Sequence, residues 1–284
     1  MSEKGESKTN FVSRDNEANI HFTEDSDDRM NWAIEKANYT LYYFEDCLKA
    51  PKSGQTRFSI KVNVDNEHIW LSAPEFDSEG NLFGVVENEP LHTTTVKKNQ
   101  KIGLDKGLIS DWIIEENGRL IGGYTIRAIR DGYTGDELKE FDSTLGMIID
   151  EGEDYFKADF NTPEGAILCL EDAYNTHNAD SVIACMNFFV EASVMLHRMG
   201  LGTQITEESL EKTANILQNT FLKRLMDFGF PSFTGIKRAF PVREKISNNY
   251  FIITEVCYFP DGRTSIQKLH TYLTQNGWRV INTY

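Results

Sequence analysis

The sequence predicts an α+β protein in two parts, each with helix first and an antiparallel sheet after it. Apolar residues recur at helical spacing between residues 26 and 50, and again between residues 162 and 228. In the stretch that follows each of these regions, apolar residues alternate with polar ones, as in half-buried strands. A chain of 284 residues is long enough for two domains with separate cores.

The first half opens with a predicted helix. Ser26, followed by Asp27 and Asp28, is typical of a helix start, because a capping side chain precedes acids at the positive end of the helix dipole. Pro51 and Gly54 end the helix. Its apolar face repeats at spacings of three and four residues: Ile34, Ala37, Leu41, Phe44 and Leu48.

Strand patterns follow, and together they predict a curled antiparallel sheet. Phe58 to Val64 alternates strictly, and further apolar segments lie at 68–71 and 82–86. Asn117-Gly118 separates the apolar runs 112–116 and 119–130, and predicts a hairpin because a type I′ turn needs positive φ at both positions. Gly122-Gly123 inside the second run indicates a bulge or a close approach of the backbone.

The second half starts with Thr162-Pro163-Glu164, a helix N-terminus with proline at its first position. A short helix from Asp180 and a short strand near 188–194 are expected next. A long helix then runs from Thr206 to the stop at Gly229. Turn residues such as Asn276-Gly277 separate the last predicted strands, which are 232–246, 249–259, 263–273 and 277–283.

Two family resemblances fit this order of elements. The segments HIWLSAPEF, GNLFGVVENEP and ISDWIIEENGRLIGGYTIRAIRD resemble the YegJ-like family, a bacterial domain of unknown function. The segments TPEGAILCLEDAYNTHNADSV and NGWRVINTY resemble the nuclear transport factor 2-like superfamily, which implies an α+β cone whose curved antiparallel sheet wraps a long helix. The predicted domains are therefore a disordered polar tail at 1–25, a YegJ-like α+β domain at 26–143, a linker at 144–160 and the cone at 161–284.

The negative charge lies almost entirely in the first half. Residues 1–160 contain 32 acidic and 18 basic residues, a net charge of −14, whereas residues 161–284 have a net charge of −1. A strongly acidic half repels nucleic acid and anionic membranes and attracts basic partners. No run of eighteen apolar residues occurs and the N-terminus has no apolar core segment, so we expect a cytoplasmic protein.

The resemblance to the YegJ-like family implies an accessory role without catalysis, because some members of that family accompany secreted toxins as immunity proteins. The favoured function is therefore a binding protein that neutralises a cognate, basic bacterial toxin. This function needs no cofactor, no metal and no catalytic residue. The candidates for contact with the partner are acidic: Asp27, Asp28, Glu87, Glu89, Glu115 and Glu116.

Motifs for phosphate binding, zinc hydrolysis and serine nucleophiles are absent from the sequence. The resemblance to the cone fold nevertheless implies a pocket, and hence an alternative function as a small-molecule-binding protein or an enzyme of isomerase or dehydratase type. The pocket candidates are Tyr174, His177, Glu255 and Tyr258. Both faces of the strand at 249–259 are apolar, so the sequence leaves open whether Glu255 points inward. The same two apolar faces suit a homodimer through this half.

Overall fold

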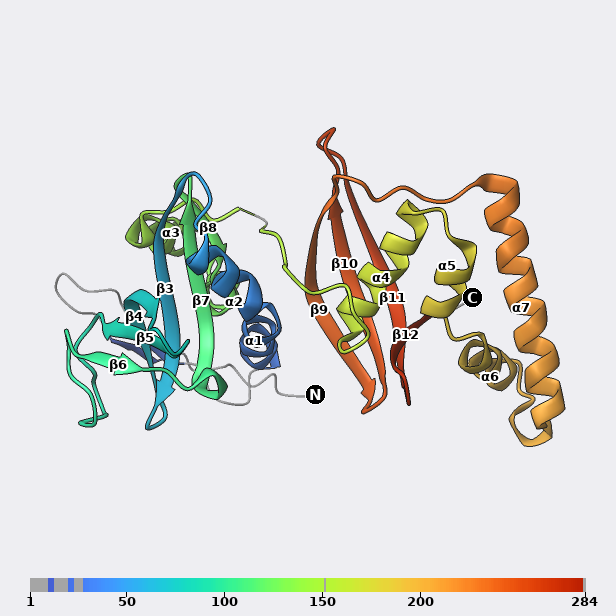
Figure 1. The fold of residues 1–284 in the computed structure, drawn as a ribbon. Helices are drawn as coiled ribbons and strands as arrows, with labels where there is room; N and C mark the ends of the chain where they lie inside the picture. Colours follow the sequence, from blue (N-terminus) through green and yellow to red (C-terminus); the bar gives the residue numbers. More distant parts are fainter. Residues whose placement is uncertain (1–9, 13–19, 23–27, 151, 283–284) are drawn as a thin grey trace. The chain divides into compact units, whose positions relative to one another are not determined.

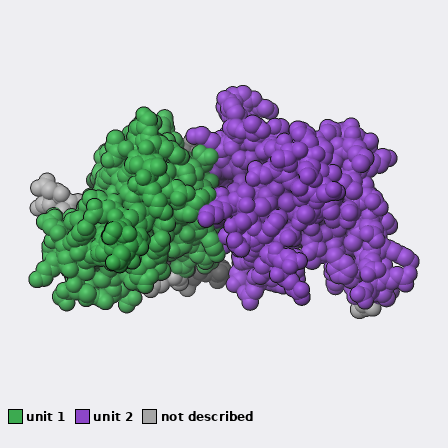
Figure 2. All heavy atoms as spheres, in the orientation of Figure 1, with its two compact units in different colours: residues 1–155 green, residues 156–284 purple. Residues whose placement is uncertain are grey.

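The computed structural model describes residues 10–12, 20–22, 28–150 and 152–282. The chain divides into two compact units, residues 1–155 and 156–284 (Figure 2). The division falls inside the stretch that the sequence analysis assigned to a linker. Within the predicted tail, β1 (Asn10–Val12) and β2 (Ile20–Phe22) form an antiparallel pair, and the rest of that tail, with Ser26 and Asp27, lies outside the described residues.

Unit 1 is built on a six-stranded antiparallel sheet of strand order β6-β5-β4-β3-β7-β8 (Figure 1). The helix α1 (Asp28–Lys49) packs on one face of this sheet, mainly against β7. Register shifts between β3 and β7 and between β4 and β5 mark bulges. The strands are β3 (Gln55–Val64), β4 (Glu67–Phe76), β5 (Leu82–Val86), β6 (Lys101–Gly103), β7 (Ile109–Glu116) and β8 (Arg119–Gly122), with a short 3-10 turn η1 (Lys106–Leu108) before β7.

Trp112 forms the centre of the main core of unit 1. It is fully buried, and its indole Nε1–H donates to the carbonyl of Ala37 in α1 at 3.1 Å. The ring of Phe44 lies 5.7 Å from that of Trp112. Ala37, Leu41 and Phe44 of α1 are buried here, as the helical spacing predicted, because these positions share one helix face.

The predicted strand 119–130 is wrong beyond Gly122. The strand β8 ends there, and α2 (Tyr124–Arg130) follows directly. Gly122 and Gly123 both have positive φ, 71° and 63°, which turns the chain out of the sheet. A Cβ on Gly122 would lie 2.5 Å from the Trp112 ring, so the close backbone approach predicted from the glycine pair is present.

A smaller core lies on the other side of unit 1. Ile113, Leu120, Ile126 and Met147 are buried together there, with Phe141 of α3 (Gly135–Leu145) packed against them. The guanidinium of Arg130 in α2 donates two hydrogen bonds to Asp142 in α3, at 2.7 and 2.8 Å. The Gly-rich and acidic stretch 131–160 therefore contains a helix that belongs to unit 1.

Unit 2 consists of helices on a four-stranded antiparallel sheet of order β12-β11-β10-β9 (Figure 1). The strands are β9 (Lys237–Ser247), β10 (Tyr250–Tyr258), β11 (Thr264–Thr274) and β12 (Gly277–Ile281). All four correspond to strands that the turn residues predicted. The helices are α4 (Pro163–Asn175), α5 (Ala179–Cys185), α6 (Phe188–Arg198) and α7 (Glu207–Phe228), with a 3-10 turn η2 (Gly202–Gln204) before α7.

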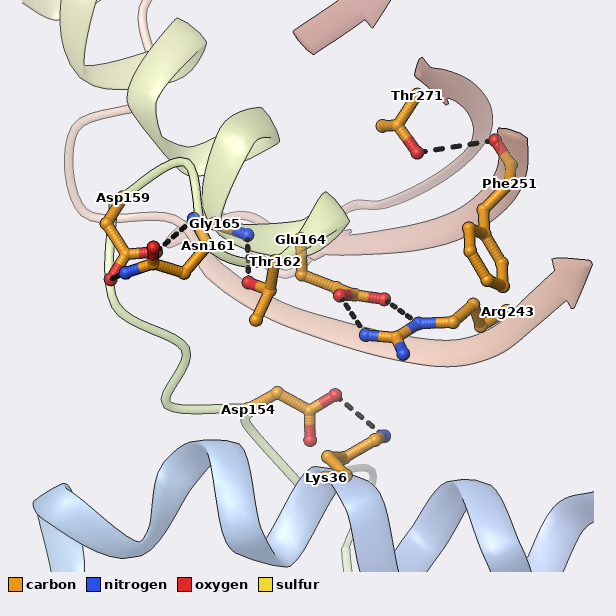
Figure 3. Close-up of polar contacts among 10 residues, drawn as sticks. All are labelled: Lys36, Asp154, Asp159, Asn161, Thr162, Glu164, Gly165, Arg243, Phe251 and Thr271. Carbon is orange, nitrogen blue, oxygen red and sulfur yellow. Dashed lines mark hydrogen bonds and ion pairs between the residues drawn. The ribbon is translucent and has the colours of Figure 1, made fainter. Parts of the chain in front are cut away.

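The helix α4 covers the sheet of unit 2. It packs against β10, β11 and β12, and it starts at Thr162, whose Oγ1 accepts a hydrogen bond from the N–H of Gly165 at 3.0 Å (Figure 3). The long helix α7 packs instead against α6, on the side of α4 away from the sheet (Figure 1). The resemblance implied that the sheet wraps the long helix, and this expectation is wrong.

The predicted strand at 188–194 is also wrong, because this segment is the start of α6. The Oδ1 of Asn187 accepts a hydrogen bond from the N–H of Val190 at 3.0 Å and caps the helix. The aromatic and β-branched residues Phe188, Phe189 and Val190 favoured a strand in the sequence, and this local preference is overridden by the cap and by packing against α7. No helix among the described residues combines the length and the apolar character needed to span a membrane.

Candidate functional site

Two carboxyl groups lie side by side in the core of unit 2. Glu171 comes from α4 and is 3% exposed, and Glu255 comes from β10 and is fully buried. Ile253 and Cys257, two residues to either side of Glu255, are also buried. The face of β10 that carries Glu255 therefore points inward under α4, which resolves the choice that the sequence left open.

One arginine lies beside both carboxyl groups. The Nε of Arg238, on β9, contacts Oε2 of Glu171 as an ion pair and lies 3.7 Å from Oε1 of Glu255. The terminal nitrogens of the same guanidinium donate to the backbone carbonyls of Ile236 and Phe233, at 2.8 and 3.2 Å. Two of its five N–H groups therefore bond to backbone carbonyls, and Nε is the nitrogen that contacts the two carboxyl groups.

A second buried carboxylate on α4 provides a comparison within the same unit. Glu164, two helical turns before Glu171, is fully buried and accepts two hydrogen bonds from Arg243 of β9, at 3.0 and 2.6 Å (Figure 3). That pair is neutral, and both of its carboxylate oxygens are bonded. The cluster around Glu171 has one carboxyl group more than it has arginines, so it needs a proton or a cation for neutrality.

Because two carboxyl groups share one arginine, the pair is expected to retain a proton. Burial, and next the negative charge of Glu255, raise the pKa of Glu171 to about 9. A pKa of about 9 favours the protonated form of the Glu171 carboxyl at neutral pH. Burial also raises the pKa of the Cys257 thiol to about 12, with a contribution from the two neighbouring carboxyl groups. At neutral pH this thiol keeps its proton.

The cluster lies one side chain away from solvent. Gln267 faces Glu255 across the β10–β11 ladder, and its Nε2 donates to Oε2 of Glu255 at 2.5 Å. Gln267 is itself exposed, as are its neighbours at the start of β11. Gln267 therefore links the buried carboxyl pair to the surface of the sheet.

The structure does not gather the other pocket candidates around Glu255. Tyr174 is half-buried and stacks on Phe233, with ring centroids 6.1 Å apart, and burial raises its pKa to about 12. His177 is exposed, just beyond the end of α4, with its ring edge-on to Phe230. Tyr258 projects from the opposite face of β10, because side chains three residues apart on a strand point to opposite sides.

Glu171 and Arg238 are not among the site residues predicted from the sequence. A signal for Glu171 was present, since Glu164, Ile167 and Glu171 recur at spacings of three and four residues and share the buried face of α4. No comparable signal existed for Arg238. Its position on β9 becomes meaningful only when β9 pairs with β10, where Arg238 is the register partner of Cys257.

The predicted partner-binding acids are spread over unit 1. Asp28 and Glu89 are exposed, whereas Asp27 lies outside the described residues. Arg57 donates to Oε1 of Glu87 at 2.9 Å, and Gln55 donates to Oε2 of Glu116 at 2.8 Å. Glu115 is half-buried and is the register partner of Arg57. Glu87, Glu115 and Glu116 thus lie beside Arg57 or Gln55 of β3, as residues of an ordinary sheet surface do.

The buried acids of unit 1 stabilise its fold. The carboxylate of Asp111 is fully buried and accepts hydrogen bonds from the N–H groups of Trp112, Tyr124 and Thr125, which fixes the start of α2. Its pKa is raised by burial, against the lowering effect of its bonds to Thr125 and of the nearby Lys61. Glu67 similarly accepts the N–H groups of residues 91–93.

Comparison with known proteins places unit 1 in a family of bacterial proteins without an assigned function. Residues 27–149 match the family described as "Uncharacterized protein conserved in bacteria (DUF2314)". The chain is also 31% identical, over 120 residues, to the uncharacterized protein YegJ of Escherichia coli K12, a match that covers 41% of this chain and 76% of that protein. The chain therefore belongs to the DUF2314 family, and the YegJ-like resemblance is confirmed.

Two other proteins are similar to parts of this chain. The chain is 27% identical, over 180 residues, to protein NMB1133/NMB1171 of Neisseria meningitidis serogroup B, whose name refers to ankyrin repeats. That match covers 59% of this chain and 66% of the relative. A Campylobacter jejuni crystal structure, named as an NTF2-like transpeptidase, aligns with 43% of this chain and all of its own at 10% identity, with a TM-score of 0.27.

Proposed function

We propose that the chain is a binding protein whose acidic first unit engages a basic protein partner, and that a cognate bacterial toxin is the class of partner that suits it. The observation that carries this proposal is the charge of the first half, a net −14 over residues 1–160. An acidic surface of this size increases the rate of association with a basic protein, and the effect weakens as salt screens it.

The placement of the acids in unit 1 supports the proposal. The fully buried Asp111 and the largely buried Glu67 are bonded to backbone N–H groups of their own unit. Asp28, Glu79 and Glu89 are exposed to solvent. The net charge of this half thus includes exposed carboxylates that a partner can reach.

The test is to purify the tagged full-length chain from its native cell and to identify what accompanies it by mass spectrometry. The proposal expects one basic protein at a stoichiometric ratio, lost at high salt. It also expects the loss of that protein when exposed acids of unit 1 are neutralised: Asp28→Asn, Glu79→Gln and Glu89→Gln. The matched control neutralises three exposed acids of α7 and should keep the partner: Glu207→Gln, Glu211→Gln and Asp227→Asn.

Either of two results would overturn this function. One is recovery of the chain alone at low salt. The other is a partner whose binding is weakened equally by the unit 1 variant and by the control on α7. Binding that survives high salt in both variants would likewise contradict a mechanism based on charge, because attraction between exposed charges is screened over about 10 Å at ordinary ionic strength.

The buried carboxyl pair favours a second candidate function, a small-molecule enzyme of isomerase or dehydratase type in unit 2. Glu171 and Glu255 place a proton donor and a proton acceptor side by side, which is the arrangement that such proton transfers need. A screen of small metabolites with the full chain tests it. Turnover should disappear in Glu255→Gln and persist in Glu207→Gln, and turnover that persists in Glu255→Gln would exclude the pair as the site.

A homodimer through unit 2 is compatible with either function. Large apolar side chains of α7 are exposed, with Ile216 at 65%, Met226 at 80% and Phe228 at 85%. We propose that these residues contribute to self-association. Light scattering of the full chain tests this, with Ile216→Glu expected to shift the mass from dimer to monomer. A wild-type chain that is monomeric at high concentration would contradict it.

A further inference from the structure

Three potential ligand atoms converge in the core of unit 2. Glu171, Glu255 and Cys257 are all buried, and each offers one oxygen or sulfur atom such that the three atoms lie within 4.8 Å of one another. Glu255 and Cys257 are two residues apart on β10 and therefore point to the same side of the sheet. Glu171 reaches the same point from α4.

Part of this cluster is bonded and part of it is not. Gln267 donates to Oε2 of Glu255, and Arg238 forms an ion pair with Oε2 of Glu171. Among the described residues, Oε1 of Glu171 and Oε1 of Glu255 are buried without a hydrogen-bond partner. Buried carboxylate oxygens without partners are costly, and they are uncommon in native proteins unless water or an ion satisfies them.

We propose that Glu171, Glu255 and Cys257 form a binding site for a single zinc ion. Two carboxylate oxygens and one sulfur suit a borderline-soft ion such as Zn²⁺, whereas Mg²⁺ and Ca²⁺ require shells of oxygen. Ligand atoms around a tetrahedral Zn²⁺ lie roughly 3.3–3.8 Å apart. Displacements of about 1 Å, through side-chain rotation, would bring the three ligand atoms to this spacing. Three protein ligands leave a fourth position for water or a small ligand.

The neighbouring polar residues have the role that such a site requires. Gln267 donates to Oε2 of Glu255 and Arg238 pairs with Oε2 of Glu171, and these contacts fix the orientation of the two carboxylates. The site is independent of the acidic surface of unit 1, because none of its residues belongs to that unit. Gln267, which bonds Glu255, is exposed at the start of β11.

The charges of the cluster suit a divalent cation. Three anionic ligands, the guanidinium of Arg238 and Zn²⁺ sum to zero, so the buried cluster is neutral with the ion bound.

The test uses the full-length chain, stripped with a chelator and titrated with Co²⁺ as a spectroscopic substitute for Zn²⁺. One equivalent should produce the near-ultraviolet charge-transfer band of a thiolate–cobalt bond, with the intense visible absorption of a tetrahedral site. Zn²⁺ should then displace the Co²⁺ and remove both signals.

Variants identify the ligands. Cys257→Ser should remove the charge-transfer band, and Glu171→Gln should weaken Co²⁺ binding at least tenfold, the lower end of what loss of a group that supports a metal site costs. The matched control is Cys185→Ser, another buried thiol of unit 2 that lies outside the cluster, and it should leave the band unchanged. The proposal is overturned by a wild-type chain that shows no band at stoichiometric Co²⁺, or by a band that survives in Cys257→Ser.

Discussion

Replacement of Glu171 by glutamine should change how the stability of unit 2 depends on pH. In the metal-free protein the pKa of Glu171 is raised from 4.5 to about 9, so between these values the folded state holds a proton that the unfolded chain has released. The contribution of this proton to the free energy of unfolding is therefore at its maximum below pH 4.5. It decreases as the pH rises toward 9. The slope is at most about 1.4 kcal/mol per pH unit, or roughly 4 kcal/mol over three units.

Glutamine carries no proton to lose, so the Glu171→Gln variant should lack this slope. The assay is urea unfolding of both proteins from about pH 5 to about pH 8 with a chelator present, with the free energy of unfolding compared at each pH. The curves of wild type and variant should converge or cross as the pH rises. Parallel curves would refute the idea that the pair retains a proton, whatever their vertical separation.

A control at Glu164 separates this effect from the loss of any buried carboxyl group. Glu164 is paired one-to-one with Arg243, and Glu164→Gln leaves that arginine without its counter-charge at every pH in the range. We expect destabilisation by about 3–5 kcal/mol. Because Arg243 stays charged throughout, this loss should be nearly the same at each pH.

Three further predictions concern unit 1. Trp112→Ala removes the largest fully buried side chain and should lower the free energy of unfolding by about 3–5 kcal/mol in urea titrations; a loss below about 1 kcal/mol would contradict its central position. Gly122→Ala places a Cβ against the Trp112 ring and should destabilise unit 1 by several kcal/mol, whereas Gly118→Ala, also at positive φ but with open space around it, should cost only about 1 kcal/mol; equal losses would count against the close approach. Asp111→Ala removes the acceptor at the start of α2 and should speed hydrogen exchange of the Thr125 amide, and unchanged protection would show that the cap is dispensable.

Local patterns predicted most of the fold. The alternation in the strands and the turn residues between them located all four strands of unit 2 and the Asn117-Gly118 hairpin of unit 1. Two predicted strands were wrong, and in both cases contacts outside the local apolar pattern explain why. The run after Gly122 looked like a continuing strand, but the backbone of Gly123 and the buried carboxylate of Asp111, a residue of β7, start a helix there. The apolar run at the start of α6 favoured a strand, but the side chain of Asn187 caps a helix there.

The candidate site could be predicted only in part. Glu255 was recognised because a carboxylate on an apolar strand face is unusual, and the structure shows that this face is the buried one. Its partners Glu171 and Arg238 come from other elements and meet it only through the packing of α4 and the register of β9 with β10. Spacing along the sequence carries no information about such contacts, and His177, chosen for its chemistry alone, lies outside the cluster.

The most direct measurement of the central claim is a carbon-13 NMR titration of the glutamate side-chain carboxyl groups in the metal-free, full-length protein. The account predicts that one carboxyl resonance titrates several pH units above the rest, and that this resonance is absent from Glu171→Gln. It also predicts that one equivalent of Zn²⁺ shifts that resonance at neutral pH. Titration of every glutamate near the ordinary value of about 4.3 would contradict the account.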